Sequence, residues 1–157
     1  MFKVTPEALN AMDQPAFANA VGWIFEHSPW VAERAWAVRP FADLAALHRE
    51  MVRQVEAASP EEQLALLRAH PDLGTRAALT AASASEQAAF DFDQRFIALN
   101  QSYRDKFGFP FLYAVKGSTK HDILRALESR LPSDRDTELA EALRQVYKIA
   151  EFRLQEI

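Results

Sequence analysis

Helix-start signals recur along this chain more regularly than any other feature. Thr5-Pro6-Glu7 and Ser28-Pro29 each place a capping hydroxyl before a proline at the first helical position. Ser59-Pro60-Glu61-Glu62 adds a carboxylate three residues after the cap, which is the spacing of a capping box. The same spacing occurs three more times, in Ser83-x-x-Glu86, Thr119-x-x-Asp122 and Ser133-x-x-Asp136.

Apolar residues with helical period follow each of these signals, so the sequence predicts an all-α fold. Only four of the 157 residues are glycine, and alanine, the best helix former, is abundant. We expect one compact domain over residues 1–157, built as an irregular bundle of about eight helices. The predicted helices span residues 6–11, 14–26, 29–37, 41–57, 60–69, 84–106, 120–130 and 134–155.

Composition excludes several kinds of chemistry. The chain has no cysteine, so it has no disulfide, thiolate metal site, iron–sulfur cluster or cysteine nucleophile. Its glycines cannot form the usual phosphate-binding loops, and its four histidines are too scattered for a helical metal site. The net charge of -4, with both signs mixed, does not predict nucleic-acid binding. No spanning segment or secretory leader is evident, so we expect no membrane partner and a cytoplasmic location.

His70 is the first candidate for chemistry, because histidine exchanges protons near neutral pH. Pro71 disfavours a helical backbone at His70, so we expect the preceding helix to end there and to present the imidazole from a turn. The alternative is a cationic side chain that meets the negative end of the helix dipole.

Ser83, Glu86 and Gln87 form a second candidate group. A carboxylate beside an amide can accept and donate the hydrogen bonds of a ureide. The alternative is that Ser83 and Glu86 form a capping box and bind no ligand.

The aromatic stretch from Phe107 to Tyr113 is too broken by Gly108 and Pro110 to be helical. It fits either a plug in the core or the wall of a pocket, where its backbone would offer N–H and C=O groups to a ligand.

The last predicted helix aligns Leu139, Leu143, Val146 and Ala150 as its apolar stripe. Arg153 follows Val146 by seven residues, so it points the same way and fits either an anion contact or a helix-end residue with a solvated head. The helical pairs Glu138 with Ala142 and Glu141 with Gln145 are interpreted as solvated surface that carries no chemistry.

Taken together and in this order, these segments resemble the 2-oxo-4-hydroxy-4-carboxy-5-ureidoimidazoline (OHCU) decarboxylase family of urate breakdown. The resemblance runs from about residue 13 to residue 155. Its most specific blocks are Ala69-His70-Pro71-Asp72-Leu73-Gly74 and Lys106-Phe107-Gly108-Phe109-Pro110-Phe111. The chain departs from the family pattern at Thr75, where glycine is frequent, and at Ala88-Ala89-Phe90, where many members have Ala-Gly-Leu.

The resemblance implies an all-α enzyme that needs no cofactor or metal and converts OHCU, a small ureidoimidazoline, to (S)-allantoin and carbon dioxide. It implies that His70 and Glu86 are the catalytic residues. It further implies substrate contacts from Pro71, Ser83, Gln87, Phe109, Pro110, Phe111, Leu112, Tyr113 and Arg153.

Two other functions fit the residues alone. One is a helical interaction module without catalysis. The other is a cofactor-free hydrolase of cyclic ureides, in which His70 and Glu86 activate water. Apolar faces on the first helices fit either the core or a homodimer contact.

Overall fold

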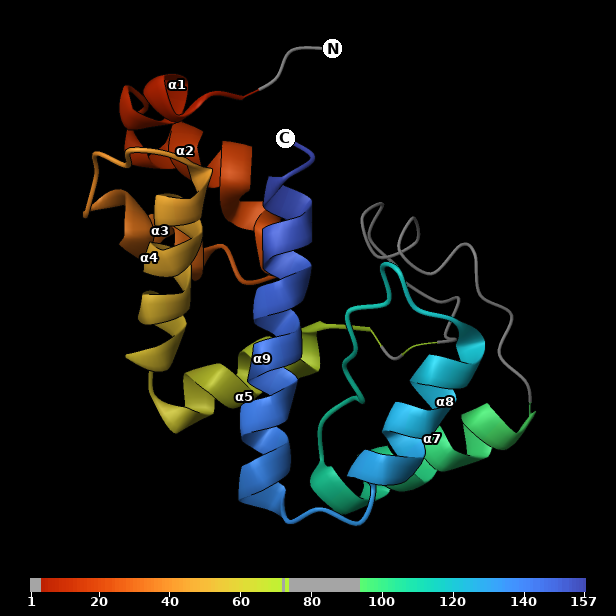
Figure 1. The fold of residues 1–157 in the computed structure, drawn as a ribbon. Helices are drawn as coiled ribbons and strands as arrows, with labels where there is room; N and C mark the ends of the chain where they lie inside the picture. Colours follow the sequence, from red (N-terminus) through yellow and green to blue (C-terminus); the bar gives the residue numbers. More distant parts are fainter. Residues whose placement is uncertain (1–3, 72, 74–93) are drawn as a thin grey trace. The chain divides into compact units, whose positions relative to one another are not determined.

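The computed structural model describes residues 4–71, 73 and 94–157 (Figure 1). This part of the chain contains eight α-helices, one 3-10 turn and no strand, which confirms the all-α class. None of the described helices is long and apolar enough to cross a membrane. The chain divides into two compact units, one formed by residues up to Ala69 together with Tyr147–Ile157, the other by His70–Val146.

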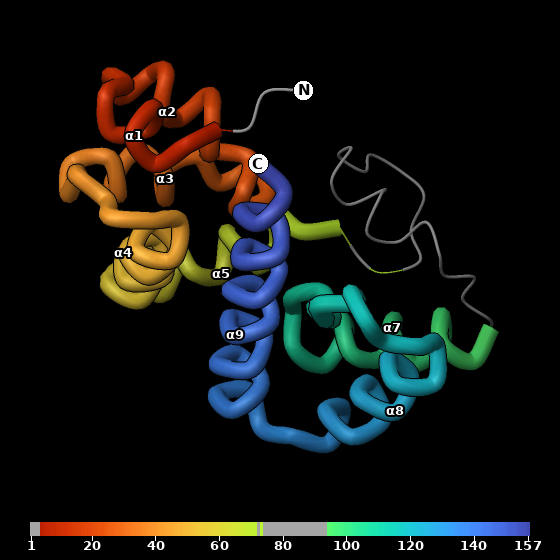
Figure 2. The backbone as a smooth tube through the Cα atoms, turned by 45° about the horizontal axis from the view of Figure 1, so that its top comes forward, coloured from red at the N-terminus to blue at the C-terminus, as the bar shows by residue number. Residues whose placement is uncertain are grey.

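The first unit has its core between short N-terminal helices. α3 packs against both α2 and α4 (Figure 2), and Phe17, Val31, Leu47 and Met51 are buried there. Its helices are α1 (Pro6–Asn10), α2 (Gln14–Val21), the 3-10 turn η1 (Gly22–Ile24), α3 (Trp30–Trp36), α4 (Leu44–Glu56), α5 (Pro60–Ala69) and the C-terminal end of α9 (Arg135–Leu154).

The second unit contains α7 (Gln94–Phe107), α8 (Lys120–Arg130) and the N-terminal part of α9. α7 and α8 pack against each other (Figures 1 and 2). Between them runs a non-helical segment that carries buried aromatic rings. Tyr103 of α7 packs among these rings, and its ring centroid lies 4.6 Å from that of Phe107, 6.0 Å from that of Phe109 and 5.3 Å from that of Phe111.

Three predicted helix caps are confirmed by their hydrogen bonds. Thr5 Oγ1 accepts from the Ala8 N–H at 3.1 Å. Ser59 and Glu62 form both halves of a capping box, each at 3.1 Å. Thr119 and Asp122 do the same at 2.9 and 3.1 Å. The hydrogen bond from the Thr119 N–H lowers the pKa of the Asp122 carboxyl.

Two predicted caps are wrong. Ser28 Oγ donates to the Glu26 carbonyl at 3.0 Å, and α3 begins without a side-chain cap. At the start of α9, Asp134 rather than Ser133 caps, because its carboxylate accepts from the Thr137 N–H at 2.8 Å. Aspartate alone also caps α2 and α4, through Asp13 and Asp43.

Three predicted helix boundaries need correction or qualification. The helix predicted over 14–26 ends at Val21, where the chain tightens into η1, and Gly22 of this turn lies against Pro29. The helix predicted from residue 41 starts at Leu44, since Asn10 holds the Phe41 backbone with bonds of 2.8 and 2.9 Å. Of the helix predicted over 84–106, residues 84–93 lie outside the described part.

The Thr119 capping box gives a stability prediction. Thr119→Ala removes the hydroxyl that accepts from the Asp122 N–H, so the free energy of unfolding should fall by about 1 kcal/mol. Urea denaturation at pH 7 measures this. The matched control is Thr137→Ala, an exposed position inside α9, where we expect a change within about 0.5 kcal/mol. Equal losses in the two variants would contradict the capping role.

Candidate active site

His70 follows directly after α5, whose last residue is Ala69. The helix therefore ends where Pro71 was predicted to end it. The His70 residue is 5% exposed, and its Nε2 atom is inaccessible to solvent. This burial places the imidazole in the protein interior at the end of α5, and the alternative of a cation at the negative end of the helix dipole stays open.

Asn100 of α7 holds the chain just after His70. Its Nδ2 donates to the Leu73 carbonyl at 3.2 Å, and the residue is buried. Its Oδ1 is also buried and accepts no hydrogen bond from a described residue. A helix of the second unit thus fixes the backbone three residues beyond the imidazole.

Ser83, Glu86 and Gln87 lie outside the described residues, as does Gly74. Their roles as catalytic and substrate-contacting groups therefore stay predictions, and so does the alternative in which Ser83 and Glu86 form a cap.

The predicted break after α7 is confirmed. Gly108 has a φ of 78°, the left-handed conformation that glycine adopts without strain, and the chain then continues without helix to residue 115. Phe109 and Phe111 are fully buried, and Leu112 is nearly so, which favours the core interpretation for these side chains. Tyr113 is half-buried, and its hydroxyl lies 3.1 Å from Ser118 Oγ.

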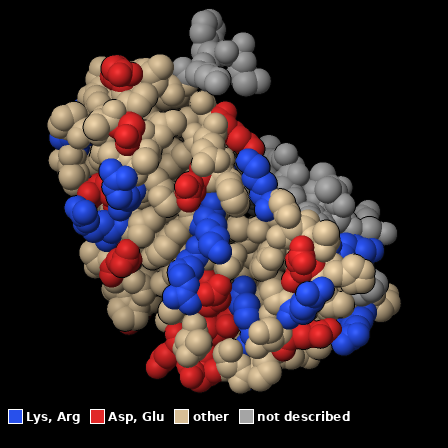
Figure 3. Space-filling view, in the orientation of Figure 1, with Lys and Arg blue, Asp and Glu red and all other residues tan. Residues whose placement is uncertain are grey.

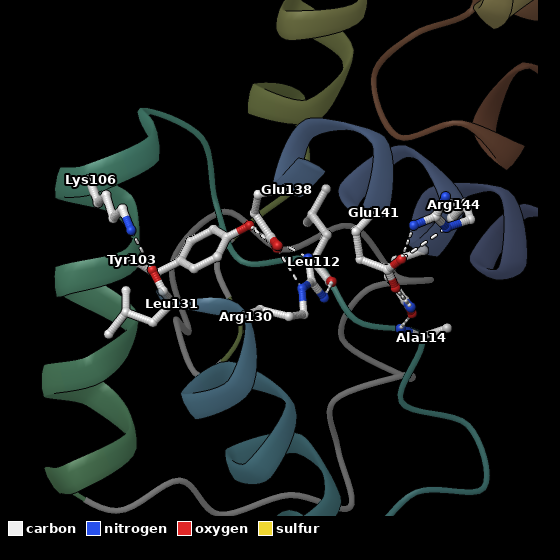
Figure 4. Close-up of polar contacts among 10 residues, drawn as sticks. Tyr103, Lys106, Leu112, Ala114, Arg130, Leu131, Glu138, Glu141 and Arg144 are labelled. Atoms are coloured by element: carbon white, nitrogen blue, oxygen red, sulfur yellow. Dashed lines mark hydrogen bonds and ion pairs between the residues drawn. The ribbon is translucent and has the colours of Figure 1, made fainter. Parts of the chain in front are cut away.

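A buried polar network lies against this aromatic segment (Figure 4). Glu138 of α9 accepts from the Tyr103 hydroxyl and from Arg130 Nε, both at 2.5 Å. Arg130 Nη1 donates to the Leu112 carbonyl at 2.8 Å, and its guanidinium lies 4.5 Å from the centre of the Phe111 ring. The network therefore joins three helices to the backbone of the segment.

A second chain of hydrogen bonds reaches the same segment two residues later. The Ala114 N–H donates to Gln145 Oε1 at 3.0 Å, and Gln145 Nε2 donates to Glu141 Oε1 at 2.8 Å (Figure 4). Partial burial raises the pKa of Glu141, but the bonds from Gln145 and Arg144 outweigh this effect and lower it overall. The carboxylate thus remains ionised and holds the Gln145 amide in one orientation.

The interpretation of Glu138 and Glu141 as solvated surface residues is wrong. Glu138 is 1% exposed, and Glu141 is half-buried. In the second unit, α9 buries Glu138, Ala142, Gln145 and Val146, so the predicted stripe is buried at Val146, whereas Leu139 and Leu143 are partly exposed. Small Ala142 among these buried positions is the local signal that sequence reasoning missed.

Arg153 is buried in the first unit, on the side of α9 that its spacing from Val146 predicted. Its Nη2 lies 2.8 Å from Glu26 Oε2, and Nη1 lies 3.2 and 3.3 Å from the carbonyls of Trp23 and Ile24. The guanidinium is 2% exposed, so a solvated head at the helix end is excluded. Its role as a substrate contact stays a prediction.

A groove of about 470 Å³ in the first unit contains none of the predicted site residues. Burial, together with the Glu56 carboxylate, raises the pKa of Tyr147 in this groove to about 12, so its phenol stays neutral. Among the described residues, no three His, Asp or Glu side chains could hold a metal ion. Acidic and basic side chains are intermingled on the face that Figure 3 shows.

The structure thus defines an all-α protein with a buried histidine directly after a helix. A sequence model of the OHCU decarboxylase family matches residues 10–155. The 2-oxo-4-hydroxy-4-carboxy-5-ureidoimidazoline decarboxylase of Haloferax volcanii is 47% identical, over 99% of this chain and 97% of its own length. This chain belongs to the OHCU decarboxylase family.

Two further similar proteins are longer. The uric acid degradation bifunctional protein PucL of Bacillus subtilis is 46% identical over 98% of this chain, which spans 32% of PucL. The crystal structure of an (S)-allantoin synthase matches with a TM-score of 0.78 and 37% identity, over 98% of this chain and 54% of that one. In both cases, this chain corresponds to part of a larger polypeptide.

The buried ion pair of Arg153 and Glu26 gives a second stability prediction. Arg153→Met leaves a carboxylate that is 1% exposed without its cationic partner, so the free energy of unfolding should fall by about 3 kcal/mol or more. The matched control is Arg144→Met in the same helix, whose side chain is 61% exposed, so that its pair with Glu141 should contribute at most about 1 kcal/mol. Chemical denaturation compares the two variants, and a loss at Arg153 no larger than that at Arg144 would contradict the prediction.

Proposed function

We propose that this chain is a cofactor-independent decarboxylase that converts OHCU to (S)-allantoin and carbon dioxide in urate degradation. Membership of the OHCU decarboxylase family supports this activity. The structural observation that carries the proposal is the burial of His70 in the turn after α5, where a proton-exchanging group is shielded from water.

The proposed substrate supplies its own electron sink. Its carboxylate and a hydroxyl share one ring carbon, which lies beside a C=N bond. When the bond to the carboxylate breaks, carbon dioxide leaves and the electron pair moves into the imine, whose nitrogen takes a proton. The hydroxyl then loses its proton to become a carbonyl, and the former imine carbon gains one. The reaction consumes one proton overall, and protonation from one face sets the configuration.

The protein then has to orient the carboxylate, hold the ureide and move protons. We propose that His70, oriented by Glu86, moves the proton of the hydroxyl and of the intermediate. Gln87 and backbone groups of residues 109–113 hold the ureide, beside Pro71 and Ser83. Arg153 is proposed as an anion contact, and its bond to Glu26 supports a fixed orientation of the guanidinium.

A homodimer and a cytoplasmic location complete the proposal. Trp23 and Val38, two large apolar side chains of the first unit, are 41% and 46% exposed, and we propose that they take part in a contact with a second copy. Sedimentation of the purified chain tests the homodimer.

His70→Ala tests the assignment of the acid–base residue. With freshly generated OHCU, kcat/KM for (S)-allantoin formation should fall by about 100-fold or more, because a positioned proton donor contributes about that much. His121→Ala is the matched control, since His121 is exposed on α8, and it should retain wild-type activity. Formation of (S)-allantoin by His70→Ala at the wild-type rate would show that the assignment is wrong.

Labelling of the substrate distinguishes decarboxylation from ureide hydrolysis. With ¹³C in the carboxylate of OHCU, the wild-type chain should release the label as carbon dioxide in proportion to the allantoin formed. A product that keeps the label would indicate a hydrolase and would refute the proposed reaction.

A further inference from the structure

We propose that Arg130, Glu138 and Gln145 are positioning residues that fix the two peptide groups flanking Tyr113, so that the Tyr113 backbone binds the ureide of the substrate. This inference rests on the proposed function, in which residues 109–113 contact the substrate. It adds three side chains, from α8 and α9, that act through the backbone of that segment without contacting the substrate.

The first peptide group joins Leu112 to Tyr113. Arg130 Nη1 holds its carbonyl oxygen at 2.8 Å. This peptide is trans, so its C=O and its N–H point in opposite directions. The Tyr113 N–H is therefore directed away from Arg130.

The second peptide group joins Tyr113 to Ala114. Gln145 Oε1 accepts from the Ala114 N–H at 3.0 Å. Because the Gln145 amide also donates to Glu141 at 2.8 Å, its oxygen is the atom that faces Ala114. By the same geometry, the Tyr113 C=O is directed away from Gln145.

These two bonds leave both backbone groups of Tyr113 available. Within the described part of the chain, neither its N–H nor its C=O forms a hydrogen bond. One residue thus offers a donor and an acceptor whose directions are both fixed. A ureide carries alternating C=O and N–H groups, so it matches this pair in the way that one extended backbone matches another.

Glu138 keeps the Arg130 side chain in the required orientation. Its carboxylate is 1% exposed and accepts from Arg130 Nε and from the Tyr103 hydroxyl, each at 2.5 Å (Figure 4). Burial and the bond to Glu138 raise the pKa of Tyr103, so its phenol keeps the proton that it donates. With Nε bound to Glu138, the planar guanidinium directs Nη1 to Leu112.

Stability alone does not explain this arrangement. Replacing both members of a buried ion pair with apolar residues of similar size often leaves stability unchanged or raises it. The double variant Arg130→Met, Glu138→Leu therefore tests positioning in a chain without an unpaired buried charge, although the Tyr103 hydroxyl and the Leu112 carbonyl lose their partners.

The first readout is kinetic. In the double variant, KM for OHCU should rise about tenfold while kcat changes much less, since the Tyr113 backbone binds a part of the substrate that does not react. The matched control is Arg95→Met, Glu128→Leu, which removes an exposed pair of 2.7 Å in the same unit with the same substitutions. The control should keep the wild-type KM.

The second readout is spectroscopic and follows the Tyr113 amide directly. The chain has three tyrosines, so labelling with ¹⁵N-tyrosine gives three backbone amide signals, and Tyr113→Phe identifies that of Tyr113. Titration with (S)-allantoin should shift this signal in the wild-type chain. In the double variant, the shift at the same allantoin concentration should fall by more than half.

The outcomes separate this inference from the proposed function. If the wild-type chain does not turn over OHCU, the proposed function fails. If it does, and the folded double variant keeps both the wild-type KM and the Tyr113 shift, the positioning role is refuted. Should the double variant not fold, Arg130→Lys gives the same test, because lysine keeps the charge but cannot bind Glu138 and Leu112 with a planar fork. A wild-type KM and shift in Arg130→Lys would also overturn the inference.

Discussion

The carboxylate of Glu138 is buried in the second unit and needs the hydrogen-bond donors that water would otherwise supply. The Tyr103 hydroxyl and the Arg130 guanidinium supply them. An isolated buried charge costs several kcal/mol, so the side chains that solvate it must stay where they are. Because Arg130 also holds the Leu112 carbonyl, this requirement extends to a backbone segment that has no strand partner among the described residues. The position of the Leu112 carbonyl in this segment therefore depends on how one buried carboxylate is solvated.

The first unit contains a similar arrangement. Arg153 binds Glu26, which is 1% exposed, and also lies within hydrogen-bond distance of the carbonyls of Trp23 and Ile24. In each unit an arginine joins a buried carboxylate to backbone carbonyls of a non-helical or 3-10 segment. α9 contributes one member of each pair, Glu138 near its start and Arg153 near its end. This long helix thus does more than bury apolar area, since it orders segments that lack regular hydrogen bonds of their own.

Local sequence signals predicted the features that depend on neighbouring residues. The caps at Thr5, Ser59 and Thr119, the helix end before Pro71 and the turn at Gly108 follow from contacts within four residues, and all are confirmed. Helical spacing also predicted the side of the last helix on which Arg153 lies, but it left open whether its guanidinium is solvated or, as observed, buried.

Features that depend on distant residues could not be predicted in this way. The start of α4 depends on Asn10, which lies 31 residues before the backbone that it binds. Glu138 looked like a surface residue because Tyr103, its partner, lies 35 residues away. A charged residue on a helix is usually solvated. Glu138 can be buried because the fold brings hydrogen-bond donors from distant parts of the chain to its carboxylate.

The difference between local and distant contacts also limits what the aromatic block Phe107–Phe111 indicates about the site. Its side chains are buried against Tyr103 and form the core of the second unit, so their identity is constrained by packing. The groups proposed to bind the substrate from this segment are peptide N–H and C=O groups, which every residue except proline has. The aromatic motif therefore indicates the site indirectly, through side chains that hold the backbone in place. The N–H and C=O of Tyr113, which are proposed to bind the substrate, are identified only from the hydrogen bonds of the two neighbouring peptide groups.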